Sequence, residues 1–133
     1  MPKITMTPED MLKGLPFVNG WYKAEVVDAT VKPSKDNGSI NYVATCKVST
    51  KEGERTIDAR FNSKAIGFMK PYLAALEGLS MNEFVEKHKS GLDFEFEATK
   101  GGKLQIKIEN KLFENRQVSE VNDFAPFDYN VPF

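Results

Sequence analysis

The sequence has few of the residues that build metal centres, disulfides or membrane spans. Its 133 residues include one cysteine, Cys46, and one histidine, His88. One cysteine excludes an internal disulfide, and the two residues are too few for a Cys/His zinc cage. No apolar run approaches the ~20 residues of a membrane-spanning helix, and the first residues lack the apolar core of a secretion signal. We therefore expect a small cytoplasmic domain with no metal, no cofactor and no membrane contact.

Signals of catalysis are equally sparse, because no Gly-x-x-x-x-Gly-Lys-Ser/Thr phosphate loop is present. His88 stands among charged neighbours and is typical of a solvated surface residue, and Cys46 falls on an inward strand position. The alternating carboxylates Asp93, Glu95 and Glu97 would suit a divalent metal in a small nuclease. A solvated row of charges is the simpler interpretation of these carboxylates, so we expect that the protein is not an enzyme.

The charge is unevenly distributed along the chain, although the formal net charge is only −1. Residues 1–116 hold all 18 basic residues and 16 acids, which gives this part a balance of +2. Residues 117–133 hold no basic residue and three acids, and they are rich in phenylalanine. The sequence thus indicates a slightly positive body followed by an acidic, aromatic tail.

Period-two alternation predicts strands over most of the body. From Trp21 the apolar positions alternate, and their phase flips after Val26, which predicts a β-bulge in a long first strand. Residues 40–48 and 57–61 predict the second and third strands. Asn62 or Ser63 then caps a helix that is interrupted by Pro71, and a second helix begins at Ser80.

The last two predicted strands are residues 92–97 and 103–108, joined by a loop over residues 99–101. In the expected register Phe96 pairs with Leu104, Glu97 faces Lys103 and Asp93 faces Lys107, so their outer face would be neutralised. The resulting order is three strands, helices, then two strands.

This order predicts a mainly β protein with a five-stranded OB-fold-like barrel and a helix insertion between strands 3 and 4. We divide the chain into an N-terminal arm, residues 1–19, an OB-fold domain, residues 20–116, and an acidic, aromatic C-terminal tail, residues 117–133. OB-folds bind oligonucleotides and oligosaccharides through the face of strands 2 and 3 and the loops between strands 1–2 and 4–5. Residues 32–38 and 99–102 are the expected loops.

Binding of single-stranded nucleic acid requires cations along the phosphates and aromatic rings that stack on bases. Each candidate also has a simpler interpretation, as a solvated charge or a core aromatic. The expected phosphate contacts are Lys23, Lys32, Lys35, Lys47, Arg60 and Lys100, and the expected stacking residues are Trp21, Tyr42 and Phe61.

The last residues, Asp128-Tyr129-Asn130-Val131-Pro132-Phe133, resemble the terminal tip of bacterial single-stranded-DNA-binding proteins. In that family the tip docks replication and repair enzymes. The resemblance implies that Pro132 and Phe133 dock and that Asp128 makes the charge contact, with Tyr129 and Val131 beside them. The sequence departs from the family in having one acid in its last six residues and no Gly/Gln-rich linker. The alternative is that the tail packs on the domain.

The body is similar to small phage-encoded single-stranded-DNA-binding proteins in its segment Gly20-Trp21-Tyr22-Lys23-Ala24 and in the helix at residues 65–76. This resemblance implies that the acidic tail can occupy the protein's own DNA groove until DNA displaces it.

The leading hypothesis is a sequence-independent single-stranded-DNA-binding protein that acts in phage replication, recombination or repair, in the host cytoplasm. Its partners would be single-stranded DNA and replication or recombination proteins, and exchange of tails could give a homo-oligomer. The alternative from another class is a protein-interaction module that binds no nucleic acid, and a metal-dependent nuclease is third.

Overall fold

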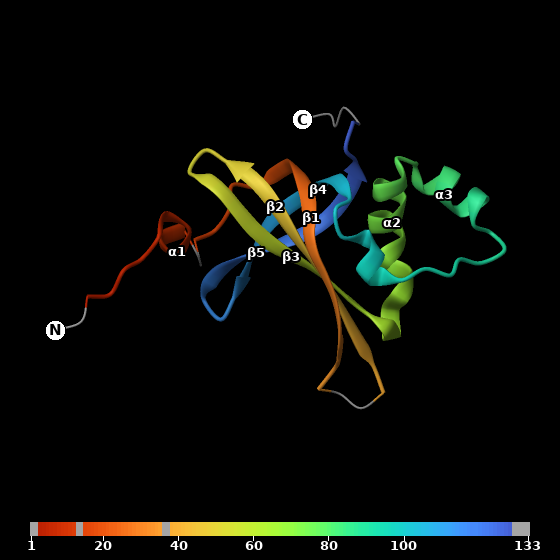
Figure 1. Cartoon of the computed structure of the whole chain (residues 1–133), viewed down its shortest axis with the longest axis horizontal. Coiled ribbons are helices and arrows are strands. Elements are labelled where there is room, and N and C mark those ends of the chain that lie inside the picture. The colour runs from red at the N-terminus through yellow and green to blue at the C-terminus, as the bar shows by residue number, and fades with distance from the viewer. Residues whose placement is uncertain (1–2, 13–14, 36–37, 129–133) are drawn as a thin grey trace.

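The computed structural model describes residues 3–12, 15–35 and 38–128. Five antiparallel strands form one sheet in the order β3-β2-β1-β4-β5. Within the described residues β3 and β5, at the two ends of this order, are not hydrogen-bonded neighbours, so the sheet is not closed. The expectation of a mainly β chain with helices between the third and fourth strands is confirmed (Figure 1).

The elements have the following bounds. The strands are β1 (Gly20–Pro33), β2 (Ile40–Thr50), β3 (Gly53–Asn62), β4 (Lys103–Phe113) and β5 (Arg116–Pro126). The helices are α1 (Pro8–Leu12), the 3-10 helix η1 (Ser63–Met69), α2 (Lys70–Glu77), α3 (Met81–Lys87) and the 3-10 helix η2 (Phe96–Thr99).

The predicted bulge in β1 is confirmed. The register between β1 and β2 shifts between Val26 and Asp28, so that Val26 and Ala29 both point into the core. The backbone of Val26 also bonds the segment that leads into β4, because its N–H donates to the Gly102 carbonyl (2.8 Å) and its carbonyl accepts from the Gly101 N–H (2.7 Å). The bulge therefore fixes the start of β4 against β1.

The helix boundaries follow the expected capping residues. The Asn62 side chain accepts from the Lys64 N–H at 2.9 Å and begins η1, and Pro71 lies in the first turn of α2. Ser80 and Glu83 form a reciprocal capping box at the start of α3. Both helix starts expected from these residues are thus confirmed.

The predicted strand over residues 103–108 is confirmed as part of β4, but the strand expected at residues 92–97 and its pairing with 103–108 are wrong. Residues 92–95 have no regular structure, Phe96 begins η2, and β4 pairs instead with β5. Residues 116–126, most of which the sequence analysis assigned to the tail, are a strand of the sheet. Glu114 and Asn115 form the turn between β4 and β5, and both adopt positive φ (50° and 65°). The turn therefore lacks the glycine by which such a hairpin is usually recognised in a sequence. A register shift between Lys107 and Ile108 also breaks the alternation in β5, which hid this strand from the pattern.

An aromatic cluster fills the space between the inner face of the sheet and α2. Phe61, Tyr72 and Phe124 lie with ring centroids 5.2–5.9 Å apart. Phe96, which was expected in a strand, packs into the same cluster 5.9 Å from Tyr72. Cys46 is fully buried beside the cluster as expected, and burial raises the pKa of its thiol to about 12.

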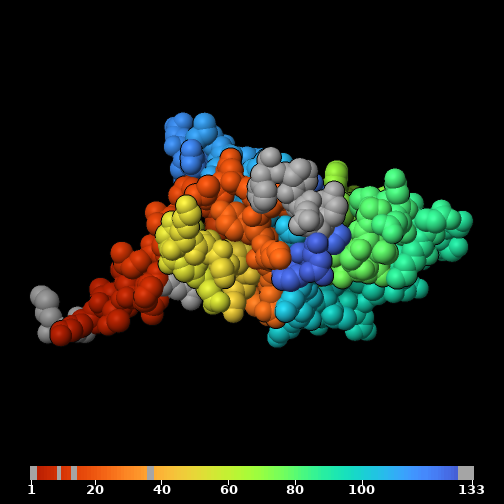
Figure 2. All heavy atoms as spheres, turned by 90° about the horizontal axis from the view of Figure 1, so that it is seen from above, coloured from red at the N-terminus to blue at the C-terminus, as the bar shows by residue number. Residues whose placement is uncertain are grey.

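The N-terminal arm packs against both β3 and β5, the two ends of the open sheet. Arg55 of β3 is only 9% exposed, and its Nη2 donates to the carbonyls of Leu12 (3.0 Å) and Leu15 (2.6 Å). Its guanidinium also lies 3.8 Å from the ring centroid of Phe17. The Phe17 N–H donates to the Ser119 hydroxyl of β5 at 2.8 Å. Figure 2 shows the arm (red) leaving the body on the side opposite α2 and α3 (green).

Candidate nucleic-acid interface

The outer face of the sheet, opposite the aromatic core, carries two of the predicted contact residues on β1. Trp21 is half-buried and lies directly opposite Lys107 of β4, and the exposed Lys23 lies opposite Gln105. The Phe127 ring covers this part of the face, with Lys23 Nζ 4.9 Å from its centroid and Lys103 Nζ 5.8 Å from it. The name Trp21 patch is used below for Trp21, Lys23, Lys103, Lys107 and Phe127.

The segment after β5 is held on the Trp21 patch by Gln105. This side chain is only 6% exposed, and its Nε2 donates to the carbonyls of Pro126 (3.1 Å) and Phe127 (3.2 Å). A buried amide with two acceptors fixes the direction in which the chain leaves the sheet. The residues that follow β5 therefore begin on the outer face.

Sequence reasoning missed two lysines of this patch because it assigned the wrong strand partner. Lys103 and Lys107 were expected to be neutralised across a hairpin by Glu97 and Asp93, which lie outside the sheet. Lys107 instead makes an exposed ion pair with Glu109, at 3.2 Å. The correct β1–β4 register would have revealed both lysines as neighbours of β1.

A second group of predicted residues meets at the end of the sheet near the β1–β2 hairpin. Across the three strands Lys32, Asn41 and Asn62 form one row on the outer face, and Thr30, Val43 and Arg60 form the next. Lys32 and Arg60 therefore lie on the same face in adjacent rows, although 28 residues separate them in the sequence.

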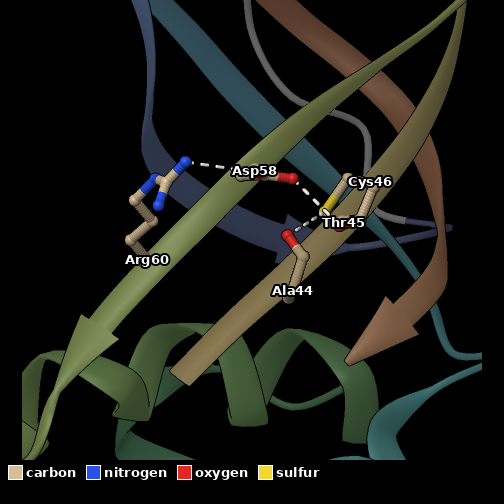
Figure 3. Close-up of polar contacts among 5 residues, drawn as sticks. All are labelled: Ala44, Thr45, Cys46, Asp58 and Arg60. Atoms are coloured by element: carbon tan, nitrogen blue, oxygen red, sulfur yellow. Dashed lines mark hydrogen bonds and ion pairs between the residues drawn. The ribbon is translucent and has the colours of Figure 1, made fainter. Parts of the chain in front are cut away.

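Asp58 holds Arg60 in a short polar chain on the outer face (Figure 3). Arg60 Nη2 lies 3.2 Å from Asp58 Oδ2, and the Thr45 hydroxyl donates to Asp58 Oδ1 at 2.9 Å. The Arg60 side chain is 73% exposed, so this pair contributes little and can exchange for a phosphate. In Figure 3 Cys46 belongs to the other face, where its Sγ contacts the Ala44 carbonyl.

The β1–β2 hairpin and η1 lie together at this end of the molecule (Figure 1). The Ile40 N–H donates to the Ser63 hydroxyl at 2.9 Å, and Asn62 Nδ2 donates to Asn41 Oδ1 at 2.7 Å. Residues 59–76 contain three basic residues and no acid. The basic end is defined as the exposed basic residues of the segments that meet here and of the first residue of α2: Lys32, Lys35, Arg60, Lys64 and Lys70.

The remaining predicted contact residues lie elsewhere. Lys47 is paired with Glu54 at 3.4 Å, and the exposed Lys100 follows η2. Tyr42 is half-buried with its ring 5.3 Å from that of Phe96. Phe61 is 9% exposed within the aromatic core, where a nucleic-acid base cannot reach it. Lys100, Tyr42 and Phe61 therefore form no common surface with the basic end, whereas Lys47 lies on the same outer face as Arg60, two rows along the sheet.

The carboxylates considered for a nuclease form no metal centre in the part of the chain that the structure describes, since no three His, Cys, Asp or Glu side chains are grouped there. His88 Nε2 lies 2.8 Å from Glu77 Oε2, and Lys87 Nζ lies 3.0 Å from Glu77 Oε1. Burial opposes ionisation of Glu77, but the bonds from Lys87 and His88 prevail and lower its pKa. His88 therefore belongs to a polar network between α2 and the end of α3.

Asp128 is exposed and is the last residue that the structure describes. The predicted docking residues Tyr129, Val131, Pro132 and Phe133 lie outside the described residues. No helix among residues 3–12, 15–35 and 38–128 has the length and apolar character to cross a membrane.

No protein-family model and no curated protein matches this chain.

Proposed function

We propose that the chain is a sequence-independent single-stranded-DNA-binding protein with an OB-fold-like body. The strand order β3-β2-β1-β4-β5, with the helices between β3 and β4, supports this proposal because it agrees with the element order of that fold. The bulged β1 pairs with both β2 and β4, so its outer face lies at the middle of the sheet.

The basic end is the observation that carries the proposal. The fold brings Lys32 and Lys35 of the β1–β2 hairpin and Arg60 of β3 to one end of the sheet, where Asp58 makes an exposed pair with Arg60 and residues 59–76 contain no acid. Cations that converge in this way attract a polyanion although the whole chain has a formal net charge of only −1. Contacts to phosphates alone carry no sequence information, which fits sequence-independent binding.

The Trp21 patch supplies the second requirement, which is an aromatic surface near cations. Trp21 and Lys23 lie on the outer face of β1, and the Phe127 ring, which follows β5, lies 4.9 Å from Lys23 Nζ. Stacking on such rings tolerates any base because every base has a π-face. Single-stranded DNA would therefore run over β1 from the basic end to this patch.

The residues after β5 would have two roles, which are to occupy the DNA-binding surface in the absence of DNA and to dock partner proteins when DNA is bound. Phe127 lies on Lys23 and Lys103, so the segment after β5 covers cations that DNA would contact. Displacement of this segment by DNA would free Asp128 and the residues after it to recruit replication or recombination proteins.

Fluorescence anisotropy with labelled oligo-dT and a matching duplex tests the function. We expect salt-sensitive binding to the single strand, weak binding to the duplex, and a large loss in the double variant Lys32→Glu/Arg60→Glu. The matched control is Lys51→Glu/Lys89→Glu, which makes the same change in net charge at exposed sites outside the basic end. Equal losses in both variants would reject a localised site. Absence of binding by the unaltered chain would favour the protein-interaction module.

A further inference from the structure

The junction between η1 and α2 exposes an aromatic side chain that the predicted interface did not include. Phe68 is 78% exposed, compared with 58% for Phe113 and 44% for Phe94, and Ile66 beside it is 48% exposed. Single exposed apolar residues are common on protein surfaces, so exposure alone assigns no role. The setting of Phe68 decides what it can bind.

The backbone that carries Phe68 is firmly held. The neighbouring Met69 is 1% exposed and Tyr72 is 0% exposed, so both anchor this segment in the core. The Asn62 cap fixes the start of η1, and the Lys70 N–H donates to the Gly67 carbonyl at its end. The Phe68 ring is therefore presented to solvent from a segment that the buried Met69 and Tyr72 hold against the core.

The surroundings of Phe68 are cationic. Lys64 precedes it in η1 and Lys70 follows it as the first residue of α2, where a Cβ placed on Gly67 would lie 3.9 Å from Lys70 Cε. The hydrogen bonds from Ile40 to Ser63 and from Asn62 to Asn41 tie η1 to the hairpin that bears Lys32 and Lys35. An exposed aromatic ring with a lysine four residues before it and another two residues after it, and with no acid in residues 59–76, suits a base flanked by phosphates.

We propose that Phe68 is a base-stacking residue and that Lys64 and Lys70 contact the phosphates on either side of the stacked base. This inference rests on the proposed function and extends it. The single strand leaves the outer face at Lys32 and Arg60 and continues over η1, so the binding track is longer than the face of the sheet. An acidic, aromatic protein segment offers the same two chemistries, and the oligo-dT test below separates it from DNA.

The test compares the full chain with Phe68→Ala, Phe68→Trp and the control Phe113→Ala. Phe113 is also an exposed phenylalanine, at 58%, but it lies at the end of β4 next to the β4–β5 turn. Loss of one stacked base weakens binding to oligo-dT about 5- to 150-fold. We expect a loss of that size in Phe68→Ala, recovery in Phe68→Trp and no change in Phe113→Ala.

Salt dependence separates the two roles. Phe68→Ala should leave the slope of log K against log salt unchanged, whereas Lys64→Gln/Lys70→Gln should reduce its magnitude by about 1.4, or roughly 0.7 for each phosphate contact on a single strand. Ultraviolet crosslinking of oligo-dT, read by mass spectrometry, should identify Phe68 directly.

The outcomes distinguish this inference from the proposed function. Binding by the unaltered chain together with normal binding by Phe68→Ala would overturn the inference and leave the function standing, and the patch would then suit a protein partner. Equal losses in Phe68→Ala and Phe113→Ala would also overturn it. A chain that binds no oligo-dT at all would refute the function itself.

Discussion

Replacement of Arg55 by alanine should markedly destabilise the protein, because this one side chain joins the N-terminal arm to β3. Its Nη2 donates to the carbonyls of Leu12 at 3.0 Å and Leu15 at 2.6 Å, and its guanidinium lies 3.8 Å from the Phe17 ring centroid. A hydrogen bond from a charged group contributes about 1.5–3 kcal/mol when buried. Water can reach the Leu15 residue, which is 54% exposed, so the lower part of that range applies.

With a cation–π contact of about 0.5–2 kcal/mol, the Arg55→Ala variant should lose about 2–4 kcal/mol of unfolding free energy. For a chain of this size the loss corresponds to a decrease in Tm of about 8–16 °C. The measurement is thermal and urea unfolding followed by circular dichroism, with limited proteolysis of the arm as a second readout.

Arg60→Ala is the matched control, since Arg60 is 73% exposed and makes one ion pair. Its loss should be below about 1 kcal/mol. Arg55→Lys should be intermediate, because lysine keeps the charge and lacks the planar fork of donors. Equal shifts in Arg55→Ala and Arg60→Ala, with no gain in arm proteolysis, would refute the assignment of Arg55 as the anchor.

Three further predictions follow from buried groups and from β5. Burial raises the pKa of Cys46 and of Tyr72 to about 12, so the unfolded chain loses these protons first and unfolding free energy should fall as pH rises from about 9 to 12. Urea unfolding at several pH values should show the fall, and Cys46→Ala/Tyr72→Phe should reduce it. Gly102→Ala should cost about 1 kcal/mol, because its Cβ would lie 2.6 Å from Leu76 Cδ2, which must move, and 3.1 Å from the Thr99 carbonyl oxygen of the backbone; an unchanged Tm would contradict this packing. A chain cut after residue 116 should lose the cooperative unfolding transition, whereas a chain cut just after β5 should keep it.

Local patterns were sufficient to predict the first three strands and the helix starts. The flip of apolar phase at Val26 has a single structural cause, a bulge, and the Ser80–Glu83 spacing has a specific capping geometry. Both signals lie within a few residues of the feature that they specify. They do not depend on which distant segment packs against them.

The second half of the sheet was not predictable in the same way. Phe94 and Phe96 alternate as in a strand, but Phe96 is buried against Tyr42 and Tyr72, while Phe94 remains 44% exposed. The alternation of the two phenylalanines therefore does not come from a strand, because only Phe96 packs into the core, and it does so as the first residue of η2. In β5 the bulge opposite β4 breaks the alternation that would have identified it.

The candidate site was predicted in part for the same reason. Lys47 and Arg60 lie on correctly predicted strands, so their outward alternation was sufficient to place them on one face, whereas Lys32 was expected in a loop and lies in the last part of β1. The position of the β4 lysines depends on which strand pairs with β4. The exposure of Phe68 depends on the break in η1 at Ala65, where φ is −134°. Neither feature has a local sequence signal.

The central claim is that the basic end contacts the phosphates of single-stranded DNA. Its most direct test is the salt dependence of oligo-dT affinity for the unaltered chain and for Lys32→Gln/Lys35→Gln. We predict a linear fall of log K with log salt, and a slope smaller in magnitude by about 1.4 in the variant, or roughly 0.7 for each lysine. An identical slope in the two proteins, or affinity that does not change with salt, would contradict the claim.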